Sequence, residues 1–247
     1  NPVIEVIADD ALQENIRSNL EIFLDNWLSS HIDEVLKDLI GLTKLKIENQ
    51  YLRALSFQLY ENNGIIKRKE INHIIKLIDK EERKKLWNMG IKIGRYHVYL
   101  PKMLKPKAVV LRTNLWKLYN NILPNTQIPT FGLNFVLNEN FDARFLLICG
   151  FEKFKNFFVR VDILEKLFIS IIEKTQNKKF KINSEMINLL GCTKENFYKL
   201  MELMNYKKTN EIDTYFFGGE AINKKKKLNT RKPINNPFEK LLSLNIK

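Results

Sequence analysis

Cationic side chains interleaved with aromatic ones gather around one strand-to-helix turn near the middle of the chain. The cluster consists of Arg95, Tyr96, Tyr99, Lys102, Lys105 and Lys107. Cations contact phosphates, and aromatic rings stack on the bases of single strands. A turn at the start of a helix also offers free backbone N–H groups to a phosphate. The pattern predicts nucleic-acid binding by Arg95, Tyr96 and the three lysines, although both tyrosines also suit a core or an edge strand.

A second candidate interface has the pattern of a helix-turn-helix. Residues 184–190 and 194–204 form two amphipathic helical segments, and the turn between them begins with Gly191. This spacing is typical of helix-turn-helix units, whose second helix enters a groove of the nucleic acid. Runs at 206–208 and 214–217 predict a small hairpin, as in a winged helix, although an ordinary helical hairpin in a core has the same pattern. The candidate contacts here are Lys194, Lys199 and Lys207.

Motifs for catalysis and for cofactor binding are absent. The chain contains no GxxxxGK(S/T) or GxGxxG phosphate loop, no DExH box and no GxSxG elbow. Its two cysteines and three histidines lack the spacing of metal ligands. We therefore expect no catalytic residue, no metal site and no cofactor in this chain, and an independent enzyme of unknown type is a third, less supported alternative.

Composition and charge indicate a globular chain with an anionic partner. Apolar residues make up 45% of the 247 residues, and the formal net charge is +13. Residues 1–62 contain 11 acidic and five basic side chains, so the positive excess lies after them. A compositional bias towards lysine, asparagine and isoleucine is an alternative source for part of this excess. No apolar run of membrane-spanning length occurs, which favours a cytoplasmic location without a membrane partner, and the initial Asn-Pro suggests a piece of a longer protein.

The hydrophobic periodicity divides the chain into four parts. Residues 1–90 predict a helical bundle with helices at about 10–40, 47–62 and 68–88. Residues 91–175 predict a mixed strand and helix segment. Residues 176–220 predict the helix-turn-helix or winged-helix-like unit, and 221–247 a basic tail. The expected fold class is α+β, predominantly α-helical.

Within the mixed segment, the alternating residues 91–100 predict one strand that Pro101 ends. Pro106 suits the first turn of a helix reaching about residue 121. Three short strands are expected next, and Asp162 is expected to cap a final helix reaching about Thr175. The three strands are predicted at about 131–137, 143–149 and 157–161.

The block at residues 89–106 resembles the segment after the motor domains in alphaproteobacterial DExH helicases of superfamily two, which are relatives of the mitochondrial degradosome RNA helicase. Asn205 departs from the family pattern, which has glycine there, but asparagine also tolerates the left-handed conformation. The matching positions are Gly90, Gly94, Tyr96, Leu100, Pro101, Leu104, Lys105 and Pro106. Weaker similarity covers Leu115-Trp116, Val159 to Leu167, Leu189 to Cys192, Tyr206-Lys207 and Asn236 to Phe238.

The resemblance implies an accessory, RNA-binding C-terminal region of an ATP-dependent RNA helicase involved in unwinding or degrading RNA. In that family, ATP and Mg²⁺ belong to two motor domains, and no position of this chain matches their motifs. The implied partners are single-stranded RNA, the motor domains of the same polypeptide and a nuclease. The alternative is a helix-turn-helix DNA-binding or protein-docking module unrelated to a helicase.

Overall fold

The computed structural model describes residues 2, 4–7, 13–44, 48–120, 127–137 and 142–217. Helices predominate and are joined by small antiparallel sheets, which confirms the predicted α+β, mainly helical class. The basic tail predicted at 221–247 lies outside the described residues. In the part of the chain that is described, no helix has both the length and the apolar character needed to cross a membrane.

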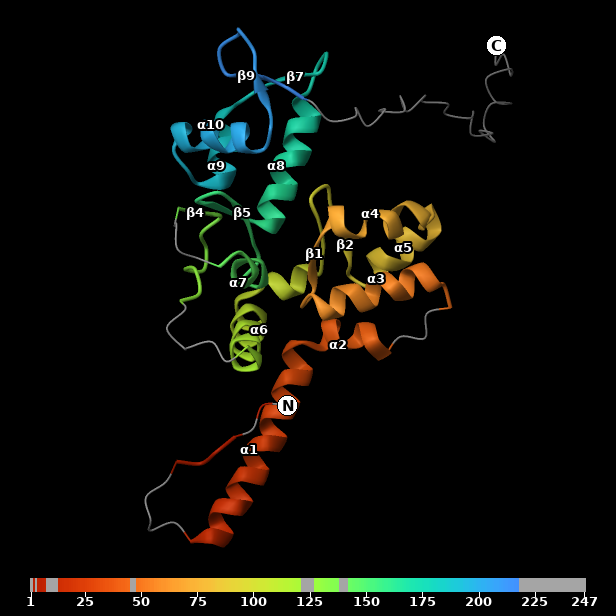
Figure 1. Ribbon diagram of the computed structural model, residues 1–247, viewed down its shortest axis with the longest axis vertical. Coiled ribbons are helices and arrows are strands. Elements are labelled where there is room, and N and C mark those ends of the chain that lie inside the picture. Colours follow the sequence, from red (N-terminus) through yellow and green to blue (C-terminus); the bar gives the residue numbers. More distant parts are fainter. Residues whose placement is uncertain are drawn as a thin grey trace, which may run out of the picture.

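The N-terminal part is helical, and its first helix projects from the rest of the molecule (Figure 1). No residue of this helix is buried. The expected helix at 10–40 is divided at Leu36, and the helix that follows continues past residue 40 to Lys44. Asn49 and Asp79 accept backbone N–H groups and start the third and fifth helices. The helices are α1 (Glu14–Val35), α2 (Lys37–Lys44), α3 (Gln50–Glu61), α4 (Arg68–Leu77) and α5 (Lys80–Asn88).

A three-stranded antiparallel sheet ties this bundle to the following segment. Its strands are β1 (Ile65–Lys67), β3 (His97–Tyr99) and β2 (Lys92–Ile93), in that order. Two predictions are corrected here: residues 1–90 are not helical throughout, and 91–100 is a hairpin and not one strand. The hairpin turns at Gly94 to Tyr96 because the Gly94 N–H bonds to the His97 carbonyl. Residues 1–90 share their core with Leu100 and Met103, so residue 90 is no domain boundary.

The middle of the chain forms a second small sheet with two helices. Pro106 starts a helix as predicted. The strand predicted at 143–149 is wrong, because Asp142 accepts the N–H groups of Arg144 and Phe145 and so starts a helix. The apolar run there suits either structure by periodicity alone. The elements are the 3-10 helix η1 (Pro101–Leu104), α6 (Pro106–Tyr119), β4 (Phe135–Leu137), α7 (Ala143–Ile148), β5 (Phe151–Phe154) and β6 (Phe157–Arg160).

The C-terminal unit contains the predicted helix-turn-helix and the hairpin behind it. Gly191 has φ 68° at the turn, and Asn205 has φ 64°, the left-handed conformation that the sequence suggested. A strand not predicted, β7, joins the hairpin in the order β7-β9-β8. The elements are α8 (Val161–Lys174), β7 (Lys179–Lys181), α9 (Ser184–Leu190), α10 (Lys194–Leu203), β8 (Lys207–Lys208) and β9 (Thr214–Phe216).

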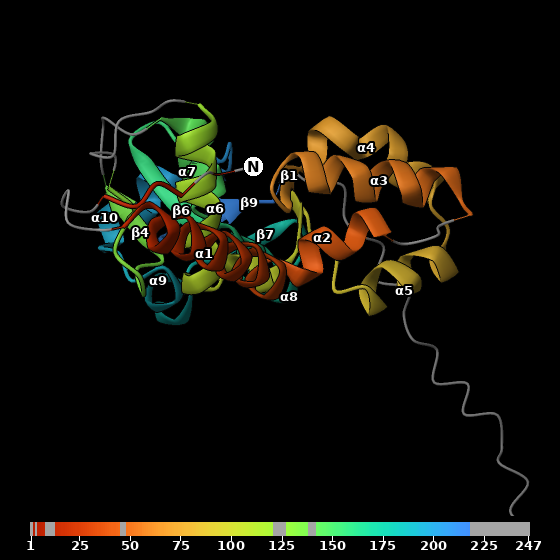
Figure 2. The same ribbon diagram turned by 90° about the horizontal axis from the view of Figure 1, so that it is seen from below.

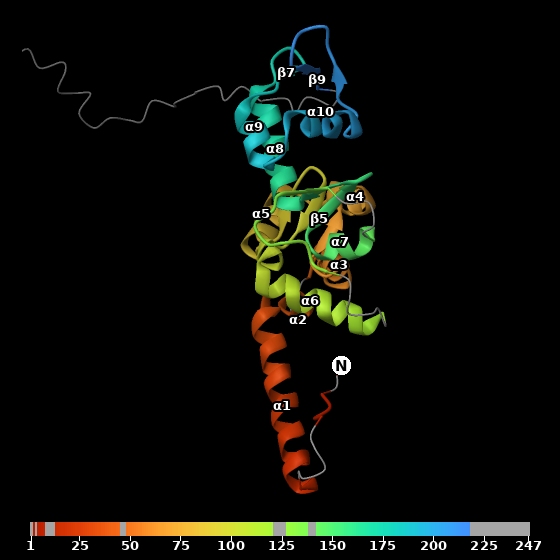
Figure 3. The same cartoon turned by 90° about the vertical axis from the view of Figure 1, so that its left-hand side faces the viewer.

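Helix α8 belongs to this unit, because its apolar residues share one buried core with α9, α10 and β9. The predicted boundary at residue 176 therefore falls inside one folded body. Seen from below, α2 to α5 form one lobe, and α6, α7 and the C-terminal elements form another (Figure 2). From the side, α1 lies at one end, α6 in the middle and α10 with β7 and β9 at the other end (Figure 3).

Candidate nucleic-acid interface

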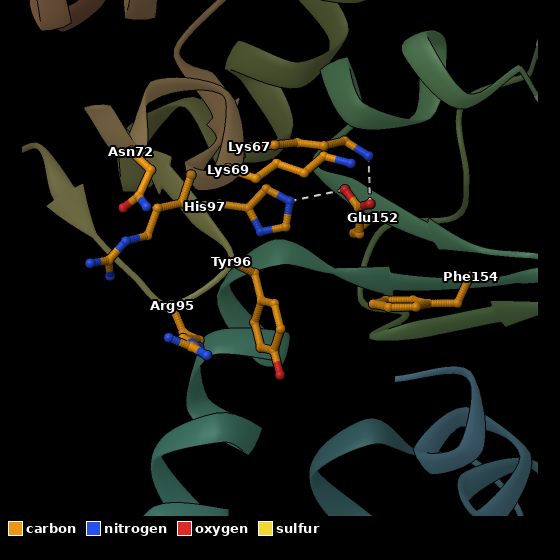
Figure 4. Close-up of a pocket in the computed structure, with 9 residues that line it drawn as sticks. Lys67, Lys69, Asn72, Arg95, Tyr96, His97, Glu152 and Phe154 are labelled. Carbon is orange, nitrogen blue, oxygen red and sulfur yellow. Dashed lines mark hydrogen bonds and ion pairs between the residues drawn. The ribbon is translucent and has the colours of Figure 1, made fainter. Parts of the chain in front are cut away.

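An open pocket of about 340 Å³ lies where β1, α4, the 94–96 turn and β5 meet (Figure 4). Four of its residues are permanently cationic and two are aromatic, and one carboxylate opposes them. The lining consists of Lys67, Arg68, Lys69, Asn72, Arg95, Tyr96, His97, Glu152 and Phe154. We call these residues the basic pocket.

A buried carboxylate holds the turn that carries Arg95. Glu165, on α8, accepts the backbone N–H groups of Arg95 at 2.5 Å, Tyr96 at 2.8 Å and His97 at 2.9 Å. A Cβ on Gly94 would lie 2.2 Å from the carboxyl carbon of Glu165, so only glycine lets the backbone come this close. The fold thus uses the backbone of this turn, while the Arg95 side chain is exposed.

The floor of the basic pocket is an ion-paired network. His97 Nε2 lies 2.9 Å from Glu152 Oε2, and Lys67 donates to Glu152 Oε1 at 2.6 Å. Burial by itself lowers the pKa of His97, but Glu152 and Glu165, whose Oε1 lies 3.7 Å from Nδ1, outweigh burial and raise it. Burial likewise raises the pKa of Glu152, but the bonds from His97 and Lys67 outweigh burial and lower it. The negative charge of Glu152 is therefore already balanced by His97 and Lys67.

The remaining cations of the pocket repel each other. Arg68 donates to the carbonyl of Gly94 at 2.6 Å, and its pKa is lowered by burial first and then by the charges of Arg95 and Arg83. Among the described residues, no carboxylate pairs with any of these three arginines. Lys69 adds a third cation beside Arg68 in the first turn of α4, which no side chain caps. Cations are unfavourable at this positive end of a helix, so an anionic ligand would relieve the repulsion.

Tyr96 joins the turn to the C-terminal unit. Its hydroxyl lies 3.2 Å from that of Tyr206, and its ring meets the ring of Phe168 edge-on. Burial raises the pKa of Tyr96, which is half-buried. Tyr99 is buried in β3, so the alternative interpretation of the tyrosines as packing residues holds fully for Tyr99 and in part for Tyr96. Phe154 is the other aromatic ring at the pocket (Figure 4).

The predicted site residues fall in three separate places, and the structure brings only Arg95 and Tyr96 into the basic pocket. Lys102 is exposed on η1 and pairs with Asp38 at 3.0 Å. Lys105 and Lys107 are exposed at the start of α6. Lys102, Lys105 and Lys107 do not line the basic pocket, so the cluster expected around 95–107 contributes only Arg95 and Tyr96 to it.

The other three predicted lysines, Lys194, Lys199 and Lys207, belong to α10 and β8, and α10 lies at the end of the molecule opposite α1 (Figures 1 and 3). Lys194 pairs with Asp213 at 2.8 Å and lies over the ring of Tyr198. Lys199 on α10 and Lys207 on β8 are exposed. None of these three lysines lines the basic pocket.

Sequence reasoning missed most of the pocket. Lys67, Arg68 and Lys69 are consecutive cations at the start of a helix, an unfavourable placement that is a readable signal. Glu152 and Glu165 gave no such signal. Both form hydrogen bonds with His97, from which they are 55 and 68 residues away in sequence. Their role follows only from the tertiary fold.

Metal-ligand clusters and activated thiols are absent from the described residues. Within the described ranges, no three His, Cys, Asp or Glu side chains are placed to hold a metal ion. Burial raises the pKa of the Cys149 thiol to about 12 and that of Cys192 to about 11, so neither is an activated nucleophile. Compared with known proteins, the chain matches no protein-family model, no curated protein and no solved structure.

Proposed function

We propose that the chain binds single-stranded RNA through the basic pocket, as an accessory C-terminal region of an ATP-dependent RNA helicase. The observation that carries the RNA-binding part is a set of cations, Arg68, Lys69 and Arg95, that form no ion pair with a described carboxylate and lie at the same pocket as the rings of Tyr96 and Phe154. Cations neutralise phosphates and flat rings stack on unpaired bases, which suits a single strand better than a duplex. The helicase part rests on the resemblance of residues 89–106.

The proposed surroundings follow from the same resemblance. Helicase motor domains in the same polypeptide would supply ATP hydrolysis with Mg²⁺, and a nuclease is the proposed further partner. The proposed location is the cytoplasm.

The direct test is fluorescence anisotropy with a labelled 12-nucleotide oligo(U) between 50 and 200 mM salt. The double variant Arg95→Glu/Lys69→Glu should bind at least about tenfold more weakly, and its salt slope should fall by about 1.4, which is two phosphate contacts on a single strand. The control variant Arg53→Glu/Lys76→Glu has the same charge change on exposed positions of α3 and α4 and should keep the wild-type salt slope. Absence of oligo(U) binding by the wild-type chain at 50 mM salt would contradict the proposal.

The lysines predicted beside the turn have a test of their own. Reversing the charge of Lys102, Lys105 and Lys107 together should weaken RNA binding, because the cationic surface would then contact fewer phosphates of the strand. Unchanged affinity after this triple change would show these lysines to be structural, and would restrict the interface to the basic pocket.

The helix-turn-helix unit supports a second candidate function, duplex DNA binding. The observation that favours it is the exposed pair Lys199 and Lys207 on α10 and the hairpin. A labelled duplex DNA of mixed sequence distinguishes the two functions in the same assay. Preference for the duplex, lost on Lys199→Glu and retained on Arg95→Glu, would favour the DNA-binding module over the RNA accessory region.

A further inference from the structure

A second groove, of about 770 Å³, lies on the other side of the Gly94–Arg95 turn. It runs between α5, β2, η1 and α8, and it shares Arg68 and Arg95 with the basic pocket. Its walls are largely apolar, and the residues that matter below are Trp87, Ile93, Phe168 and Ile169. We call it the apolar groove.

Large apolar side chains are left in solvent at this groove. Trp87 is 64% exposed. The helix that carries it, α5, buries only Leu86, and most of its other residues are charged. Ile169 on α8 is 54% exposed. The Lys92 ammonium lies 5.7 Å from the centroid of the Trp87 ring. An exposed tryptophan beside cations, facing an apolar wall, is the composition of a surface that stacks on a flat ring.

The rim of the groove is positive, and its two acids are already engaged. Asp162 pairs with Arg160 at 2.6 Å, and Glu165 accepts the three N–H groups of the turn. Arg83 donates only to the carbonyl groups of Ile75 and Ile78 among the described residues. Arg83, Lys92 and Lys166 thus face the groove together with Arg68 and Arg95. A ligand that fits must combine negative charge with flat apolar surface.

We propose that the apolar groove is a nucleobase subsite, in which Trp87 stacks on a base of the RNA strand whose adjoining phosphate lies on Arg95. This inference rests on the proposed RNA-binding function and extends it to a second site. Arg68 and Arg95 form the wall shared by the groove and the basic pocket, so one strand contacts both by crossing the turn. An acidic amphipathic peptide also matches the groove, but its apolar side chains would have no counterpart in the cationic pocket beyond the shared wall. The continuity of the two sites therefore favours RNA.

The test compares three ligands in one anisotropy assay. They are oligo(U), an abasic strand with the same number of phosphates, and a peptide with the sequence of residues 14–35, which is an acidic helix with exposed apolar side chains in this chain. The variant Trp87→Ala should bind oligo(U) about tenfold more weakly, since stacking contributes roughly 1–3 kcal/mol per base. It should bind the abasic strand as the wild type does, with an unchanged salt slope. Trp87→Phe should recover part of the loss.

The matched control is Phe57→Ala, which removes a 57% exposed ring from α3, outside both sites. It should leave oligo(U) affinity unchanged, and circular dichroism should show all three variants folded. Equal oligo(U) affinity of Trp87→Ala and wild type overturns the subsite but leaves RNA binding intact. If the wild-type chain itself does not bind oligo(U), the proposed function is contradicted instead. Peptide binding that oligo(U) does not displace, and that Trp87→Ala abolishes, overturns the subsite in favour of protein docking.

Discussion

The hydrogen bonds of Glu165 hold the turn at residues 94–97, and Glu165→Gln tests this directly. Glutamine keeps the size and shape of the side chain, which is 8% exposed in the wild type. Its amide oxygen can replace Oε1 and still accept from Tyr96 and His97. Its amide nitrogen then replaces Oε2, so the Arg95 N–H faces another donor and loses its partner.

The expected cost follows from these three bonds. One hydrogen bond to a charged acceptor is lost, and two become bonds to a neutral oxygen. Hydrogen bonds to charged groups contribute about 1.5–3 kcal/mol and neutral ones about 1 kcal/mol, so the free energy of unfolding should fall by at least about 2.5 kcal/mol. Because Arg95 belongs to the same turn, oligo(U) affinity should fall too.

Urea unfolding at pH 7, followed by circular dichroism and by tryptophan fluorescence, measures this change as a lower transition midpoint at constant m-value. Glu185→Gln is the matched control, since Glu185 lies on the surface and its only partners in the described part of the chain are Lys174 and Asn183. Its transition should coincide with that of the wild type. A midpoint for Glu165→Gln that is no lower than that of Glu185→Gln would refute the assignment of Glu165 as the support of the turn.

Three further predictions concern the same framework. Gly94→Ala should destabilise the fold, because its Cβ lies 2.2 Å from the Glu165 carboxyl carbon, and in urea unfolding the double variant with Glu165→Gln should lose less than the sum of both single changes. Stability should fall as the pH rises above about 6.5: the pKa of His97 is raised, so its contribution is complete below about 6.5 and is lost as the pH rises through the higher folded pKa. A titration of His97→Gln that keeps the full wild-type slope in this window would contradict this origin. Arg112→Lys should cost about 2 kcal/mol in thermal unfolding, since the buried guanidinium donates to the carbonyls of Asn63 and Met103, and lysine cannot reach both; a change below about 0.5 kcal/mol would contradict the bidentate role.

Elements with local signals could be predicted from the sequence. Pro106 starts α6, and Gly191 with its left-handed φ separates α9 from α10. In each case a residue within the segment dictates the boundary through its own backbone restriction or cap. The helix at 143–148 was mistaken for a strand because a run of apolar residues hides its period, and the cap at Asp142 was overlooked. Strand β1 was missed because only its pairing with β3, some thirty residues later, makes it a strand.

The candidate site could be predicted only in part, for a related reason. Arg95 stood out because its charge and neighbours are visible in sequence. Glu165 looked like any charged position on an amphipathic helix, and only the fold shows that it points into the molecule. Lys102, Lys105 and Lys107 are near Arg95 in sequence, but they do not line the basic pocket. Proximity along the chain therefore predicts a cluster at 95–107 that the basic pocket does not contain. It gives no sign of the contacts that Glu152 and Glu165 make.

The turn at residues 94–97 has two roles, a structural one for its backbone and a proposed binding one for the Arg95 side chain. Its backbone N–H groups bond to Glu165, and the Tyr96 hydroxyl contacts Tyr206, so the turn is fixed to the body formed by α8, α9 and α10. Its Arg95 side chain takes no carboxylate partner among the described residues and faces both the basic pocket and the apolar groove. A displacement of α8 would break these three hydrogen bonds at once and release the turn that carries Arg95. The C-terminal unit therefore positions the cation on which both proposed contacts depend, although its own lysines do not line the basic pocket.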